Sequence, residues 1–414
     1  FRRLCLPPEE KAGFSLKVLI ASVIVTALIV GGAVYSFTKP APQPPVKTLP
    51  PEIKLGHILP FTGALGVYSE GFANGVRLAV SEINEQGGIA GRKVILLEED
   101  TGTDPIKAAE AARKLINIQG VKAIVGAYAS SETLAAAPIA EENKVVLISP
   151  ASTSPKVTDA GKYIFRVVPS DALQGKALGE ITLAKGYKKA ATIVINNPYG
   201  VGIEDVFKKT FEAKGGKVVV SVRYELGLAT YKTELERIRA ADPEVIIDAS
   251  YADDGQIIFR EAKELGIKTA WIAAEGVADP AIFKAPGVKE ATEGMIGTKP
   301  FTPTNPASLH FLELYKKKFG KDPGIYADYA YDAAKVALMA IAYAGVYDGA
   351  EIMKALDYVG KSYKGVTGDK TFDANGDVSG EYSIWVIKAG EFVTIGHWGP
   401  TKGVEFTKYL YKDF

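Results

Sequence analysis

The stretch "KLGHILPFTGALGVYSEGFANGVRLAVSEINEQGG", residues 54–88, joins a short apolar strand to an amphipathic helix through a loop of small residues. Its apolar side chains recur at helical spacing over 72–83, and the two glycines that follow predict where this helix stops. The same unit returns in "KVILLEE" with a helix expected over 105–119, and in "AIVGA" with one over roughly 132–143. Strands that alternate with helices of about 10 to 15 residues predict parallel sheets covered on both faces.

The pattern continues beyond residue 170 and predicts a second lobe. Further helices are expected over 171–185, 200–213, 231–241 and 254–265. The segment "IFRVVPSD", residues 164–171, places the boundary where an apolar strand meets Asp171, the expected cap of the next helix. A long, largely apolar helix expected over 326–345 needs a core, so we expect the chain to return to the first lobe after about residue 300. Several crossings would form a hinge beside a cleft.

Composition limits the partners of this protein. A chain of 414 residues with 47% hydrophobic side chains can bury two cores of ordinary domain size. Lys and Arg number 49 against 48 Asp and Glu, so no overall field draws the protein onto nucleic acid. The single cysteine, Cys5, and three scattered histidines predict neither a disulfide framework nor a metal site. Small neutral or zwitterionic partners remain.

The front of the chain predicts a membrane anchor. Residues 18–37 carry no charge and are long enough to cross a ~30 Å hydrocarbon layer as a helix. Cations are concentrated before this segment, so residues 1–17 are expected in the cytoplasm and the remaining chain outside it. A cleaved signal peptide is the alternative. Residues 38–51 contain six prolines and predict an extended stalk, with a proline-rich ligand as the other interpretation.

Two loops of the first lobe offer hydrogen-bond donors at strand ends, where ligands settle in parallel α/β sheets. In "ISPASTSP", the small residues Ala151, Ser152 and Thr153 let the backbone approach a ligand and donate N–H and O–H groups. In "GAYASSET", Ser130 lies between a strand and a helix whose positive dipole end favours an anion. Together the loops suit a carboxylate, although Ser130 alone could serve as a helix cap.

Loops of the second lobe offer an aromatic and acidic set. Its members are Tyr199 in "NNPYGVG", Tyr251 and Asp253 in "DASYADDG", and Glu275 in "AAEGVADP". Such a set can hold an ammonium group through charge pairing and cation–π contact. The alternative gives Asp253 or Asp254 to a helix cap and Glu275 to solvent.

Motifs of enzymes were sought and none predicts a catalytic residue or a cofactor. The chain has no G-x-S-x-G, Walker A or H-E-x-x-H pattern, and its serines lack a histidine at a plausible spacing. "DANGD", residues 373–377, imitates part of a calcium loop without the glutamate at the twelfth position. We therefore expect a hairpin turn there.

In their order and spacing, these segments resemble type I periplasmic binding proteins, in particular the leucine/isoleucine/valine-binding family that feeds ATP-binding-cassette (ABC) importers. The resemblance covers nearly all of 53–400 and also includes "DTGTDPIKAAEAARKLI", "AEGV" and "DYAYDAA". It implies an α/β fold of two Rossmann-like lobes with parallel sheets, joined by three crossovers that form the hinge. The expected lobes are 52–170 with 301–379, and 171–300 with 380–414.

The resemblance also implies roles for the site residues. Ser130 and residues 151–153 would hold an α-carboxylate, whereas Glu275, with Tyr199 and Tyr251, would meet an α-ammonium. The walls of the side-chain pocket would come from Tyr68, Tyr128 and Tyr326, and Asp253 completes the predicted set. The implied partners are an amino acid, branched-chain or similar, and an ABC permease. A sensor of the same fold for an amide or small organic acid, signalling through a partner, is the alternative.

Overall fold

The computed structural model describes residues 48–407 of the chain. The predicted cytoplasmic segment 1–17, the apolar segment 18–37 and most of the proline-rich segment 38–51 lie outside the described residues. Between residues 48 and 407, no single helix is both long and apolar enough to cross a membrane.

The first sheet has five strands, all parallel, in the order β2-β1-β3-β4-β5. Its strands are β1 (Ile53–Leu59), β2 (Val94–Asp100), β3 (Ala123–Val125), β4 (Val146–Ser149) and β5 (Ile164–Arg166). The inner strands β3 and β4 are buried throughout, which explains why they read as unbroken apolar runs. The predicted parallel sheet is confirmed.

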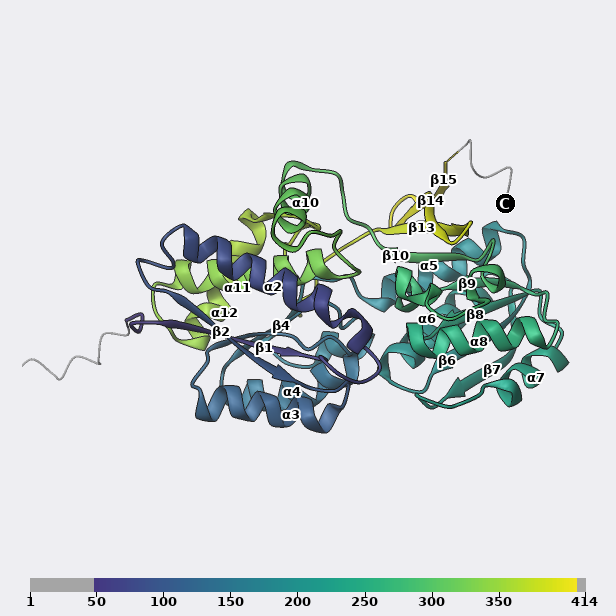
Figure 1. Cartoon of the computed structure of the whole chain (residues 1–414), viewed down its shortest axis with the longest axis horizontal. Helices are drawn as coiled ribbons and strands as arrows, with labels where there is room; N and C mark the ends of the chain where they lie inside the picture. The colour runs from purple at the N-terminus through teal and green to yellow at the C-terminus, as the bar shows by residue number, and fades with distance from the viewer. Residues whose placement is uncertain (1–47, 408–414) are drawn as a thin grey trace, which may run out of the picture. The chain divides into compact units, whose positions relative to one another are not determined.

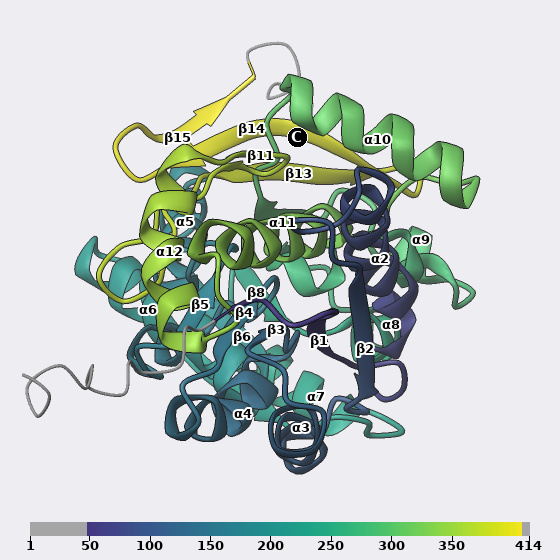
Figure 2. The same ribbon diagram turned by 90° about the vertical axis from the view of Figure 1, so that its left-hand side faces the viewer.

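Helices cover both faces of this sheet (Figure 2). On one face lie α2 (Ser69–Glu85), α11 (Ala327–Ala344) and α12 (Gly349–Ser362), and on the other α3 (Pro105–Arg113) and α4 (Ser130–Glu142). Helix α11 packs along α2, so the late apolar helix does return to the first lobe. Its buried alanines allow this close approach. Helix α10 (Pro306–Phe319) and the short pair β11 (Lys364–Gly365) and β12 (Gly368–Asp369) complete this part.

The second sheet has eight strands in the order β15-β14-β13-β10-β9-β8-β6-β7. Strands β6 (Lys189–Ile195), β7 (Lys217–Tyr224), β8 (Val245–Ala249), β9 (Ala270–Ala273) and β10 (Ile296–Pro300) are parallel to one another. Strands β13 (Tyr382–Lys388), β14 (Glu391–Gly399) and β15 (Gly403–Phe406) extend it in antiparallel fashion. The sequence does not predict this extension, which begins with β13 paired to β10 and turns into β14 at Ala389 and Gly390, both at positive φ.

The second sheet carries helices in two packed pairs. Helix α5 (Asp171–Ala184) lies against α6 (Pro198–Ala213), and α7 (Lys232–Ala240) against α8 (Ala252–Glu264). A short helix, α9 (Val288–Ala291), packs on α8. Figure 1 shows these elements around β6, β8 and β9. The helices expected over 171–185, 200–213, 231–241 and 254–265 are therefore confirmed, within a few residues at their ends.

The chain passes between the two lobes three times, after β5, after β10 and before β13. The second and third crossings run side by side, because the Phe301 N–H donates to the Glu381 carbonyl at 2.9 Å. The Tyr382 hydroxyl donates to the Ser170 carbonyl at 3.2 Å and so joins the third crossing to the first. The predicted hinge of three chain segments agrees with this arrangement, whereas the residue limits of the lobes stay a prediction.

Candidate functional site

A pocket lies where loops after the parallel strands of both lobes meet. It encloses about 410 Å³ free of protein atoms, part of it open to solvent. Its lining consists of Leu65, Tyr68, Phe72, Tyr128, Ser130, Ala151, Tyr199, Tyr251, Glu275, Gly276, Ile325 and Tyr326. Of the eleven residues predicted from the sequence, all but Ser152, Thr153 and Asp253 are in this lining. The site therefore lies at the carboxyl ends of the strands, as ligand sites of parallel sheets do.

Aromatic rings form most of the pocket wall. The rings of Phe72 and Tyr128 stack with centroids 4.0 Å apart and 16° between their planes. Across the pocket, Tyr199 and Tyr251 stack at 5.5 Å and 15°. The Tyr128 hydroxyl shares a hydrogen bond of 2.9 Å with Nε2 of buried His57, so its polar end is satisfied away from the pocket. These rings provide apolar surface in fixed orientations.

Tyr68 connects the two lobes directly. Its hydroxyl donates to the Gly276 carbonyl at 2.7 Å and accepts from the Ala252 N–H at 3.0 Å. Tyr68 belongs to the 3-10 turn Gly66–Tyr68 after β1, whereas Ala252 begins α8 and Gly276 lies in the 3-10 turn Glu275–Val277, both in the second lobe. Burial raises the pKa of this phenol well above its usual range, so the hydroxyl stays protonated and able to donate. One hydroxyl thus makes two hydrogen bonds across the cleft.

Ser130 lines the pocket but does not cap its helix. Ala129 is the N-cap residue of α4, and its N–H is satisfied by Oε2 of Glu132 at 3.0 Å. The Ser130 hydroxyl instead accepts from the N–H of Ser154 at 3.1 Å and joins the two donor loops. This contact argues against the helix-cap interpretation of Ser130, whereas its role in holding a carboxylate stays a prediction.

In the loop after β4, the three predicted residues differ in their surroundings. Ala151 lines the pocket. The Ser152 hydroxyl is buried, where it pairs with Oγ1 of Thr133 at 2.7 Å and donates to the Ala127 carbonyl at 3.2 Å. The Thr153 hydroxyl is also buried and has no hydrogen-bond partner among the residues of the described body. Ser152 thus shapes the loop, and Thr153 keeps a free polar group.

Two acidic side chains are buried beside the tyrosines. Glu275 is 3% exposed, and its Oε2 atom has no hydrogen-bond partner between residues 48 and 407. The same holds for both carboxylate oxygens of fully buried Asp171. Burial and the nearby Glu275 carboxylate raise the pKa of Asp171, and burial raises that of Glu275. Unpaired carboxylates in such a setting favour the arrival of a cation.

Asp171 is the residue that sequence reasoning missed, because it was taken for a helix cap. In the structure Ser170 is the N-cap residue of α5, and its hydroxyl accepts from the Ala172 N–H at 3.2 Å. The capping role is therefore filled one residue earlier, and the Asp171 carboxylate is left without a structural partner in the described chain. The segment "PSD", residues 169–171, contains two adjacent residues that can cap a helix. Since only one of them can take that role, this pair was the sequence signal that Asp171 could have another.

Asp253 lies outside the pocket. It is exposed in the first turn of α8, where its carboxylate accepts from Nε2 of Gln256 at 3.4 Å. Its neighbour Asp254 is buried but accepts from the Gly227 N–H at 3.1 Å and from the Tyr231 hydroxyl. The N-cap residue of this helix is Tyr251, so neither aspartate is the cap. Of the acidic side chains, Glu275 lines the pocket, whereas Asp171 is buried close to Glu275 and is not part of the lining.

Comparisons with known proteins agree with this geometry. A family model described as periplasmic binding protein matches residues 52–391. The leucine-, isoleucine-, valine-, threonine-, and alanine-binding protein of Pseudomonas aeruginosa is 31% identical over 330 residues, 79% of this chain and 87% of that protein. A leucine binding protein, LivK, from Thermotoga maritima has a TM-score of 0.79 and 32% identity, over 84% of this chain and 99% of that one.

The same fold occurs in a more distant protein with a different ligand. An ABC transporter solute binding protein from R. palustris, solved in complex with benzoate, has a TM-score of 0.75 and 19% identity. The match covers 86% of this chain and 98% of that one. At this identity the likeness shows the fold alone, so the ligand has to be inferred from the pocket.

Proposed function

This chain belongs to the periplasmic binding protein family, as its sequence predicted, and we propose that it captures an amino acid for an ABC importer. The ligand would lie in the pocket between the lobes and would be released unchanged. Binding free energy would go into closing the lobes rather than into chemistry. A permease in the membrane would be the partner that receives the ligand.

The observation that carries this proposal is a pair of buried acids in which both Asp171 oxygens and Oε2 of Glu275 have no hydrogen-bond partner between residues 48 and 407. An α-ammonium group would supply the charge that both lack, with the faces of Tyr199 and Tyr251 contributing cation–π attraction. Benzoate has no such group and would leave the carboxylates buried without a partner. The acidic pair therefore supports a zwitterion over an aromatic acid.

The opposite wall suits the α-carboxylate of the same ligand. Ser130, at the first turn of α4, offers a hydroxyl beside the positive end of the helix dipole. The neighbouring loop would add the Thr153 hydroxyl, whereas the N–H groups of Ala151 and Ser152 already donate to the Ser149 hydroxyl at 3.3 and 2.9 Å. A small zwitterion could thus bridge donors from one lobe and acids from the other, which would link occupancy to closure.

The walls support an apolar side chain of moderate size. Leu65, Phe72 and Ile325 line the pocket together with the tyrosine rings. The open space of about 410 Å³ includes solvent outside the pocket, so the lining rather than the volume supports such a side chain. Full burial of a branched aliphatic side chain contributes roughly 1.5–3 kcal/mol. Leucine, isoleucine and valine are therefore the first ligands to test.

We also propose that the body works outside the cytoplasm, held at the cell membrane by residues 18–37. The uncharged segment and the bias of cations before it support this placement. Residues 38–51 would then space the body from the membrane. If the apolar segment is a cleaved signal peptide, mass spectrometry of the mature protein from cell membranes will find its N-terminus after residue 37.

A thermal-shift screen of the purified protein tests the ligand. Each standard amino acid is added, together with L-leucinamide and benzoate. A ligand that binds only the folded state at 100 times its Kd stabilises it by about 2.7 kcal/mol, which raises the melting temperature by several degrees. We expect branched-chain amino acids to do so. If only leucinamide or benzoate raises the melting temperature, the amino-acid assignment is wrong and the alternative ligand class takes its place.

A further inference from the structure

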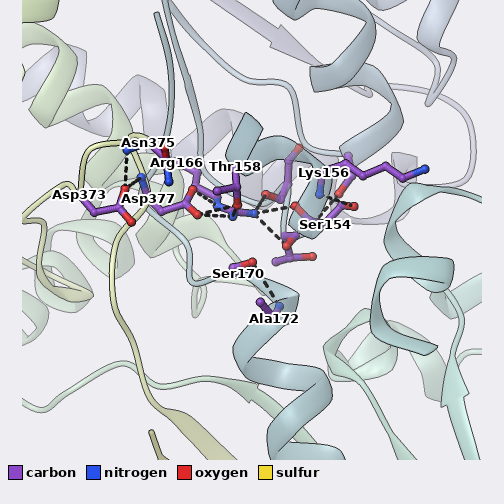
Figure 3. A network of polar contacts seen from close by, with 12 residues as sticks. Ser154, Lys156, Thr158, Arg166, Ser170, Ala172, Asp373, Asn375 and Asp377 are labelled. Carbon is purple, nitrogen blue, oxygen red and sulfur yellow. Dashed lines mark hydrogen bonds and ion pairs between the residues drawn. The ribbon is translucent and has the colours of Figure 1, made fainter. Parts of the chain in front are cut away.

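A buried arginine lies behind the donor loop. Arg166, the last residue of β5, is fully buried. Its Nη1 atom donates to three consecutive carbonyls, those of Ser152 at 3.3 Å, Thr153 at 2.9 Å and Ser154 at 2.9 Å (Figure 3). One guanidinium nitrogen thus fixes the orientation of the whole turn that follows the pocket residue Ala151.

An aspartate from the far end of the sequence balances this charge. Asp377 receives two hydrogen bonds from Arg166, Nε to Oδ1 and Nη2 to Oδ2, both at 2.6 Å. The Thr158 hydroxyl joins the pair, because it accepts from Nη2 at 2.7 Å and donates to Oδ2 at 2.8 Å. A two-pronged pair of this kind fixes the plane of the guanidinium. Without Asp377, a guanidinium that cannot lose its proton would remain buried and unbalanced.

The turn "DANGD" places Asp377 at this position. The Asp373 N–H donates to the Asp377 carbonyl at 2.8 Å, and Oδ1 of Asp373 accepts from the N–H groups of Asn375 at 2.8 Å and Asp377 at 3.0 Å. The adjacent Gly376 carbonyl accepts from the Arg166 N–H at 3.0 Å. The hairpin turn predicted for this segment is confirmed, and its acidic residues support Arg166.

The direction of the peptide groups explains what this support achieves. In a planar trans peptide, the N–H points away from the carbonyl of the preceding residue. With the Thr153 carbonyl held by Arg166, the Ser154 N–H points the other way and meets the Ser130 hydroxyl at 3.1 Å. With the Ser152 carbonyl held, the Thr153 N–H also points away from Arg166, and it donates to no group within the described chain.

The same pair also orients the acidic side of the pocket. The Thr153 carbonyl accepts a second hydrogen bond, from the Asp171 N–H at 2.8 Å. Asp171 opens α5, so the start of this helix is tied to the loop that Arg166 holds. Asp377, for its part, precedes the third crossing between the lobes, which leads into β13 at Tyr382. Arg166 and Asp377 therefore connect the donor loop, the acidic wall and the hinge.

We propose that Arg166 and Asp377 are positioning residues that hold the loop 151–154 so that the N–H and hydroxyl groups of Thr153 meet the carboxylate of the ligand. This inference rests on the proposed function of the pocket. Neither side chain lines the pocket, so both act through the backbone that they orient. Their loss should weaken recognition of a carboxylate more than recognition of the rest of the ligand.

Asp377→Asn and Arg166→Lys test this inference in the full-length protein. Asparagine keeps the shape of Asp377 and removes its charge, whereas lysine keeps the charge of Arg166 without the fork that reaches both the loop and Asp377. Tyr363→Phe is the matched control, because it removes one hydroxyl that donates to buried Asp332 at 2.7 Å elsewhere in the first lobe. Should Asp377→Asn fail to fold, Thr158→Val removes only the bridging hydroxyl.

Two measurements are made on each variant. The first is amide hydrogen exchange of residues 152–154 in the ligand-free protein, relative to Ile124 in β3. The second is the preference for L-leucine over L-leucinamide, which lacks the carboxylate.

For Asp377→Asn and Arg166→Lys we expect faster exchange in the loop, and a preference lowered about tenfold, equivalent to the loss of one hydrogen bond. Thr158→Val should change the exchange rate and the ligand preference in the same direction, but less. Tyr363→Phe should lower the unfolding midpoint and leave the exchange rate and the ligand preference unchanged.

The outcomes separate this inference from the proposed function. If both variants of the pair keep wild-type exchange in the loop, the inference is overturned whatever the ligand. If exchange rises but the preference equals that of the wild type, the pair is merely structural and the inference fails as well. If the wild type binds neither leucine nor leucinamide, the ligand assigned in the proposed function is wrong. Hydrogen exchange then still decides whether Arg166 and Asp377 hold the loop.

Discussion

Replacing Tyr68 with phenylalanine should weaken ligand binding without disturbing the pocket wall. The change removes one oxygen atom and with it the hydrogen bonds to the Gly276 carbonyl at 2.7 Å and from the Ala252 N–H at 3.0 Å. The ring itself remains beside Phe72, with centroids 6.1 Å apart. Both lost contacts join the first lobe to the second, so the closed arrangement loses them while the open one regains water at the same groups.

The expected size follows from ordinary hydrogen-bond energetics. Each such bond contributes a net ~1 kcal/mol, so the closed state should lose about 2 kcal/mol. Since ligand affinity includes the free energy of closing, the Kd for L-leucine should rise roughly 30-fold. Most of the change should be in the dissociation rate, because the lobes reopen more readily.

Tyr347→Phe is the matched control for this experiment. The Tyr347 hydroxyl also makes two backbone hydrogen bonds, accepting from the Lys122 N–H at 3.2 Å and donating to the Lys54 carbonyl, but all three residues belong to the first lobe. Isothermal titration calorimetry gives both affinities, and urea unfolding gives both stabilities. We expect the control to lose stability and keep its affinity. Equal losses of affinity in the two variants, or none in Tyr68→Phe, would refute the interlobe role of Tyr68.

Three further changes probe the charges of the site. Glu275→Gln should raise the Kd for L-leucine at least about 30-fold. The Kd for 4-methylpentanoate, which lacks the ammonium group, should rise far less. Equal increases for both ligands, measured by calorimetry, would show that Glu275 does not bind the ammonium. Asp253→Asn should leave the Kd within about twofold, since this carboxylate is exposed outside the pocket. Burial raises the pKa of Glu132 to about 7 from 4.5. The folded protein therefore binds a proton at Glu132 more tightly than the unfolded chain does. The resulting contribution to the free energy of unfolding, up to about 3 kcal/mol, is fully present below about pH 4.5 and is lost as pH rises through about 7. In Glu132→Gln, the urea midpoint should change less between pH 5 and 8 than it does in the wild type. The same pH dependence in both proteins would contradict this prediction.

The sequence predicted the layers of this protein because buried parallel strands leave a clear pattern. Strand β4 is buried throughout and apolar up to Ser149, and the helix after each strand had to show one apolar stripe. The loops at strand ends could be located for the same reason, since they begin where the pattern stops. What the pattern could not predict was the antiparallel extension β13–β15, whose strands also alternate with turns but follow no helix.

Within the site, the sequence located loops that meet at the pocket but could not assign every group in them. Ser152 and Thr153 are neighbours of similar chemistry, and which hydroxyl is satisfied depends on Thr133, which comes from another loop. The orientation of the same loop depends on Arg166 and on Asp377, more than two hundred residues from it in the chain. Likewise, Ser170 and Asp171 are both good helix caps, and only the three-dimensional start of α5 shows that the serine takes the role. Such choices are made by tertiary contacts that leave no local signal.

The two walls of the pocket are prepared in different ways, and the difference bears on how closure depends on the ligand. The donor wall is held by internal hydrogen bonds, because the Ser130 hydroxyl accepts from the Ser154 N–H and Arg166 donates to the Thr153 carbonyl. It therefore needs little reorganisation when a carboxylate arrives. The acidic wall is left unsatisfied, because Asp171 and Glu275 are buried without a partner in the described body. Closing the empty lobes would bury both acids at a cost in desolvation and mutual repulsion, and an ammonium group would remove that cost. In the proposed function, the acidic pair is therefore what makes the closed state favourable only when a zwitterion is inside.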